Sequence, residues 1–76
     1  MKELLEVIAK NLVDYPEKVS VSEVQGEHSL ILELKVAQED MGKVIGKQGR
    51  IAKAIRTVVK AAAIHEDKRV VVEIVQ

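Results

Sequence analysis

The sequence predicts a small α+β domain in which helices pack on one face of a three-stranded sheet. Three observations lead to this fold class. Apolar residues recur at helical spacing in two long segments, three other segments have the composition or alternation of strands, and polar or glycine-containing turns separate them. The chain has 76 residues, of which 47% are hydrophobic, and this suits one modest core and a single domain over residues 1–76.

Residues 1–15 predict an amphipathic helix. Its apolar positions recur at intervals of three and four, and they are Leu5, Ile8, Leu12 and Tyr15. We expect this helix to end at Pro16, because a proline disfavours helical angles in the residue before it.

A hairpin of two strands is expected next. Residues 18–24 begin with an alternation of valine and serine, and residues 30–36 place leucine or valine at every second position. Such alternation is typical of a strand with one buried face. The polar residues 25–29 between the two segments predict the turn of the hairpin.

The second half of the chain predicts two helices and a final strand. Acidic residues precede a short helix at residues 41–45, where negative charge interacts favourably with the helix dipole. A longer helix follows the glycines, with an apolar stripe formed by Ile51, Ile55, Val58, Val59 and Ala62. Residues 69–75 are rich in β-branched side chains and predict the third strand.

The charge of the chain is unevenly distributed, although the net charge is zero. Residues 1–40 carry nine acids and four bases, whereas residues 41–65 carry six bases and no acid. On the longer helix, Lys53, Arg56 and Lys60 lie nearly opposite the apolar stripe. This basic face predicts attraction to a polyanion, or else it is an ordinary solvated helix surface.

A loop of four residues, Gly46, Lys47, Gln48 and Gly49, joins the two helices. Open backbone N–H groups at the start of a helix suit a phosphate, and glycine lets another backbone approach closely. Lys47 adds a cation, and Gln48 adds a hydrogen-bond donor without negative charge. The simpler alternative is a tight turn that needs glycine only for its backbone angles.

The segment from Val44 to Ile51, VIGKQGRI, resembles the VIGxxGxxI signature of the KH domain, with Ile51 one place early for its last position. The predicted order of helix, strand, strand, helix, GxxG, helix, strand is that of the type II, prokaryotic KH fold. The resemblance covers essentially the whole chain. A chain that consists of one such domain is similar to the bacterial KhpA group of stand-alone KH proteins.

The resemblance implies particular roles for residues around the loop. KH domains clamp the backbone of about four single-stranded nucleotides with the GxxG loop, which here is Gly46, Lys47, Gln48 and Gly49. Flanking phosphate contacts would come from Lys43 and Arg50 on either side of the loop, with Lys53 and Arg56 further along the basic face.

The resemblance also implies an aliphatic groove for the bases. Its candidate residues are Met41, Val44, Ile45 and Ile51. Each is equally compatible with the core, and we favour the core for Ile45 and Ile51. The second strand, Ile31 to Val36, is expected to form the other side of the groove.

Several other classes of function are excluded. The chain has no cysteine, and its two histidines lack the spacing of a metal site, so we expect no metal and no cofactor. Glu39 and Asp40 point in different directions on a helix, which is poor geometry for acid–base catalysis, and we expect no enzyme. One tyrosine, with no phenylalanine or tryptophan, excludes an aromatic stacking surface like that of RRM domains.

No apolar run approaches the roughly 20 residues of a membrane span, and no signal segment opens the chain. We therefore expect a cytoplasmic protein without a membrane partner. The first hypothesis is a single-stranded RNA-binding protein that acts as an RNA chaperone or post-transcriptional regulator; phosphate clamping alone does not distinguish RNA from DNA. The resemblance implies a homodimer, a partner of the KhpB type (also called Jag or EloR), and a link to cell shape, elongation, division and wall biogenesis. The alternative is a protein-interaction module in which RNA binding is secondary.

Overall fold

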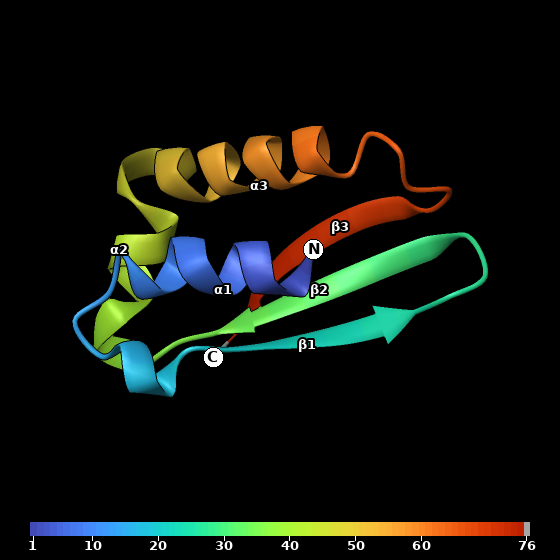
Figure 1. Ribbon diagram of the computed structural model, residues 1–76. Coiled ribbons are helices and arrows are strands. Elements are labelled where there is room, and N and C mark those ends of the chain that lie inside the picture. The colour runs from blue at the N-terminus through green and yellow to red at the C-terminus, as the bar shows by residue number, and fades with distance from the viewer. Residues whose placement is uncertain (76) are drawn as a thin grey trace.

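The computed structural model describes residues 1–75, and it confirms the α+β fold class and the predicted order of the elements. The three helices lie over one face of the sheet (Figure 1). The elements are α1 (Lys2–Lys10), β1 (Ser20–Gln25), β2 (Ser29–Lys35), α2 (Met41–Ile45), α3 (Arg50–Ala62) and β3 (Arg69–Val75).

The sheet has the strand order β1-β2-β3, so β2 is the central strand. β1 and β2 form an antiparallel hairpin, whereas β2 and β3 are parallel. A parallel pair needs a crossover connection, and α2, the glycine loop and α3 supply it. The register places Leu34 between Val21 and Ile74, so the same face of all three strands is apolar.

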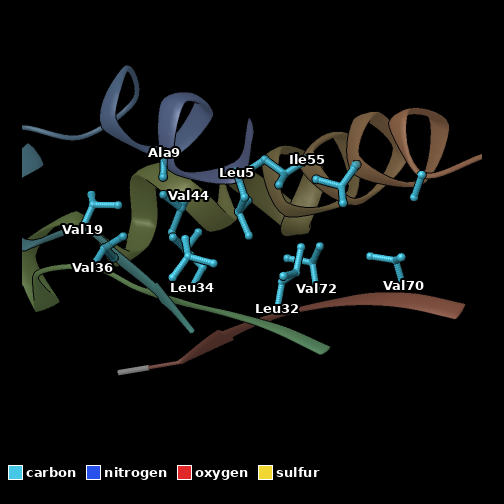
Figure 2. Close-up of a cluster of buried hydrophobic side chains, with 13 residues drawn as sticks. Leu5, Ala9, Val19, Leu32, Leu34, Val36, Val44, Ile55, Val70 and Val72 are labelled. Atoms are coloured by element: carbon cyan, nitrogen blue, oxygen red, sulfur yellow. The ribbon is translucent and has the colours of Figure 1, made fainter. Parts of the chain in front are cut away.

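The core lies between the sheet and the helices (Figure 2). Alternate residues of each strand point toward the helices, because side chains in a strand alternate between its two faces. α1 contributes Leu5 and Ala9, and α2 contributes Val44. The other buried hydrophobic residues of this core are Val19, Val21, Leu32, Leu34, Val36, Ile55, Val59, Ala63, Val70 and Val72.

α1 is shorter than the sequence predicts: it ends at Lys10, whereas the predicted helix continues to Tyr15. The Nδ2 group of Asn11 donates to the carbonyl oxygen of Val7 at 2.7 Å, a local bond that competes with the continuing helix. Beyond it the chain turns toward α2, and the backbone N–H groups of Asp14 and Tyr15 donate to Asp40 at 3.1 and 3.0 Å. These bonds replace the intrahelical bonds that a longer α1 would have made.

Asp40 ties the α1–β1 connection to the start of α2. Its side chain is 0% exposed, and its two carboxylate oxygens accept the two backbone bonds from Asp14 and Tyr15. The ammonium group of Lys43 lies 3.9 Å from Oδ1. A buried carboxylate is tolerated only when it is hydrogen-bonded and paired, and Asp40 meets both conditions.

Replacing Asp40 with alanine should therefore destabilise the domain. The substitution leaves two backbone donors without their charged acceptor, and we expect a loss of about 2–3 kcal/mol in the free energy of unfolding. Urea denaturation followed by circular dichroism would measure it. Glu39→Ala is the matched control, because the neighbouring Glu39 is exposed and should lose less than about 0.5 kcal/mol. Equal losses in the two variants would contradict this role of Asp40.

Candidate functional site

The glycine loop has an unusual backbone. Gly46, Gln48 and Gly49 have positive φ angles of 77°, 58° and 73°. Gly46 combines its φ with a ψ of 173°, a region that is essentially restricted to glycine. Gln48 is the only non-glycine residue with positive φ among the described residues. The loop is therefore a fixed bend between α2 and α3.

The two glycines are needed for different reasons. A Cβ atom on Gly46 would lie 2.6 Å from Cγ1 of Ile51, so a side chain there would collide with the first turn of α3. A Cβ atom on Gly49 would meet nothing within 4 Å. Gly46 thus packs inward against Ile51, and Gly49 leaves open space on the outer side of the loop.

Two of the four loop amides, those of Gly46 and Gly49, have acceptors in the loop or in α2. The N–H of Gly46 donates to Gly42 O at 2.9 Å, and that of Gly49 to Gly46 O at 3.1 Å. The N–H of Arg50 donates to Lys47 O. Within residues 1–75, no acceptor is found for the N–H groups of Lys47 and Gln48. The open amides predicted from the sequence are therefore reduced to one adjacent pair, with exposed side chains.

Exposed cations occur in and just after the loop that carries this pair of amides. Lys47, Arg50 and Lys53 are exposed, and no carboxylate of the described residues lies within ion-pair distance of them. Nη2 of Arg50 lies 3.5 Å from Oε1 of Gln48, a long contact that holds neither group firmly. These three cations are available to an anionic ligand.

Lys43 differs from the other predicted cations because its ammonium group forms an ion pair with Asp14. The hydrogen bond to Asp14 raises the pKa of Lys43 above its usual value, and the negative charges of Asp14 and Asp40 add to the effect, while desolvation acts against it. Lys43 therefore lies toward the α1–β1 connection, and a phosphate would have to compete with Asp14 for it.

Arg56 is also partly engaged, since its Nε donates to the carbonyl oxygen of Val72 in β3 at 3.3 Å. The N–H of Arg69 points toward β2, where it bonds His28 O at 3.1 Å. Because backbone groups of a strand alternate in direction, those of Val70, Val72 and Ile74 point away from β2. The free edge of β3 therefore lies beside the basic side of α3.

This arrangement changes the expected groove. β2 is the central strand with both edges paired, and β3 is the edge strand that Arg56 of α3 contacts. The expected groove side on β2 stays a prediction. Val44 is fully buried in the core, and Met41 and Ile51 pack against the core. Ile45 is 38% exposed, so assigning it to the core was wrong. Of the four groove candidates, Ile45 is the most accessible.

A second surface, an apolar groove between α1 and α3, was missed by the sequence analysis. Its lining consists of Ile8, Leu12, Arg50, Ile51, Ala54, Ile55 and Val58. Val58 and Ala62 belong to the predicted apolar stripe of α3, but Val58 is 48% exposed and Ala62 is also exposed, whereas Ala52 and Ala63 are buried. The apolar stripe of α3 is thus wider than the core requires. That width was the signal in the sequence, since Ile51 and Val58 lie beside the buried residues at helical spacing.

The described residues offer little for other chemistry. No group of three or more potential metal ligands occurs among residues 1–75. His28 and His65 are both exposed, in separate loops. No helix in this part of the chain has the length and apolar character needed to span a bilayer.

Comparison with known proteins agrees with the fold. The family model described as "KhpA/KhpB, KH domain" matches residues 2–74. The RNA-binding proteins KhpA of Clostridium acetobutylicum and Clostridium perfringens are each 79% identical over 75 residues, which cover 99% of this chain and 100% of each relative. The RNA-binding protein KhpA of Chlamydia pneumoniae is 54% identical over 76 residues, covering 100% of this chain and 97% of the relative. No solved structure matches the chain.

The fold and the glycine loop together define a type II KH domain. More narrowly, the chain belongs to the KhpA/KhpB family of KH-domain proteins, and it is not an enzyme.

The different roles of the two glycines can be tested by substitution with alanine. Gly46→Ala adds a collision with Ile51 to an unfavourable backbone, and we expect it to cost about 3 kcal/mol or more in unfolding free energy. Gly49→Ala is the same substitution at a position where the added Cβ meets no other atom. It should lower the unfolding free energy only by the strain of a left-handed φ, about 1 kcal/mol. Chemical denaturation of both variants makes the comparison, and a larger loss for Gly49→Ala would contradict the packing of Gly46 on Ile51.

Proposed function

We propose that this chain binds single-stranded RNA by clamping its phosphate backbone on the loop from Gly46 to Gly49. The observation that carries the proposal is the adjacent pair of free N–H groups on Lys47 and Gln48, surrounded by unpaired cations. A phosphate is acceptor-only and negatively charged, so it satisfies both donors at once. The names of these relatives, RNA-binding protein KhpA, support RNA as the nucleic acid.

The space around the loop is consistent with a polynucleotide as the ligand. Gly49 has open space where a side chain would otherwise stand, so the sugar–phosphate chain can approach the amides. Lys47, Arg50 and Lys53 would neutralise successive phosphates. At the clamp itself, the bases would be read by aliphatic side chains and backbone groups. The free edge of β3 supplies such groups beside the basic side of α3.

One site for about four nucleotides gives limited affinity and selectivity. We therefore propose a non-catalytic, cytoplasmic RNA chaperone or post-transcriptional regulator rather than a reader of one sequence. Single-stranded DNA carries the same phosphates, and a comparison of matched RNA and DNA oligonucleotides distinguishes the two.

Replacing Lys47 and Gln48 by aspartate tests the clamp directly. Two carboxylates beside the free amides would repel phosphate, and we expect RNA affinity to fall at least about 100-fold. Fluorescence anisotropy with a labelled single-stranded RNA measures this. For the unmodified chain, the logarithm of the binding constant should fall with the logarithm of salt concentration, at a slope of about −0.7 per neutralised phosphate.

A charge-matched control separates the site from net charge. Lys2→Asp combined with Gln25→Asp changes the charge equally, but neither residue lies in the acid-free segment 41–65. This control should bind RNA with little loss at physiological salt. A salt-independent affinity, or an equal loss in both double variants, would contradict phosphate clamping at the loop.

The apolar groove between α1 and α3 favours a second activity, protein interaction. We propose that this groove joins two copies of the chain into a homodimer, and that it alternatively receives the KH domain of a KhpB-type protein, with a role in cell elongation and division. A mostly apolar lining that includes the exposed Val58 is typical of the core of a homodimer interface. Two linked RNA sites would raise avidity by roughly 10² or more.

Val58→Glu should convert the dimer to a monomer, because it places a charge in the apolar contact. Sedimentation velocity measures the mass. Ile64→Glu is the matched control: Ile64 is 76% exposed but does not line the groove, and its replacement should leave the dimer intact. A dimer that survives Val58→Glu but not Ile64→Glu would show that the interface lies at the end of α3 and not in the groove.

The variant with aspartate at Lys47 and Gln48 compares the two activities. If this variant keeps full cellular function, protein interaction is the principal activity of the chain.

A further inference from the structure

Tyr15 is the only aromatic residue of the chain, and its position is unusual for a lone aromatic side chain. It lies within the α1–β1 connection, directly before the 3-10 turn Pro16–Lys18, and is 39% exposed. Aromatic residues bury large apolar areas, so a small core with no other ring would be expected to enclose it. The structure instead keeps the ring at the surface, beside α2.

The backbone of Tyr15 is held firmly in that place. Its N–H donates to Oδ2 of the buried Asp40 at 3.0 Å, and its carbonyl oxygen accepts from the N–H of Lys18 at 3.0 Å. Pro16, which follows it, restricts the backbone further. A ring on such a fixed backbone loses little conformational entropy when it binds a ligand.

Asp40 also relates Tyr15 to the clamp. Asp40 directly precedes α2, and Gly46 directly follows it. At a rise of 1.5 Å per residue, the six steps from Asp40 to Gly46 cover about 9 Å along the helix. Tyr15 is therefore fixed at one end of α2, while the phosphate-binding amides lie just past the other end.

The charges near the ring are suited to a nucleotide. The ammonium group of Lys18 lies 5.5 Å from the centroid of the Tyr15 ring. Lys43 lies between Tyr15 and the clamp, one helical turn before Gly46, in its ion pair with Asp14. Of these two cations, Lys18, which stands over the ring, can reach the phosphate of a base stacked there, whereas Lys43 is held by Asp14.

We propose that Tyr15 is a stacking site for the base of a nucleotide that leaves the GxxG clamp along α2, with Lys18 contacting its phosphate. The inference rests on the proposed function and extends the bound strand beyond the four nucleotides of the clamp. A single ring provides one stacked base, which differs from the multi-aromatic surface that the composition excludes.

The sole tyrosine makes the test direct, because tyrosine fluorescence in this chain reports Tyr15 alone. Tyr15→Phe keeps the ring and Tyr15→Leu removes it. Each form would be titrated with a labelled tetramer, which fills only the clamp, and with a labelled octamer of the same base, which extends beyond it at both ends. Anisotropy measures affinity independently of tyrosine emission.

We expect Tyr15→Leu to weaken octamer binding about fivefold to 100-fold and to leave tetramer binding unchanged, with Tyr15→Phe close to wild type. Tyrosine emission should be quenched by the octamer and not by the tetramer. Equal binding of the octamer by all three forms, or an equal loss for both RNA lengths, would overturn the stacking site while the clamp stands. If the wild-type chain binds neither RNA, the clamp itself fails, and the stacking site fails with it.

Discussion

The packing of Ile51 against the bare α-carbon of Gly46 is the contact on which the rest of the structure depends. Gly46 has backbone angles available essentially to glycine alone, and its missing side chain leaves the space that Ile51 fills. This contact lets α3 begin at Arg50 with only four residues between it and the end of α2 at Ile45. In the short chain between the two helices, the N–H groups of Lys47 and Gln48 have no acceptor within residues 1–75. The proposed chemistry thus follows from a packing constraint.

α3 has three distinct sides, and each has a different environment. Ile55 and Val59 face the sheet, Val58 faces the groove beside α1, and Arg56 faces the free edge of β3. In the proposed account the RNA site lies on the basic side and the protein site on the apolar side. Because these sides do not overlap, RNA binding and dimerisation do not compete for the same surface, although Arg50 lies at the border of both.

Local patterns predicted most of the fold, whereas contacts between distant parts of the chain were beyond them. Helical and strand periodicity are properties of neighbouring residues, so element order and fold class could be predicted. The early end of α1 could not, because it depends on backbone bonds from Asp14 and Tyr15 to Asp40, about 25 residues away. The pairing of Lys43 with Asp14 is equally non-local. Val58 was misplaced because two adjacent apolar faces of a helix form one broad stripe in the sequence.

The most direct test of the central claim is a ¹H–¹⁵N NMR titration of the chain with a short single-stranded RNA. If the two outward amides bind phosphate, the N–H signals of Lys47 and Gln48 should show the largest shifts, downfield, as their new hydrogen bonds form. Signals from the open face of the sheet, such as those of Ser22, Glu33 and Glu73, should stay in place. Large shifts on that face, with the loop amides unchanged, would contradict the account.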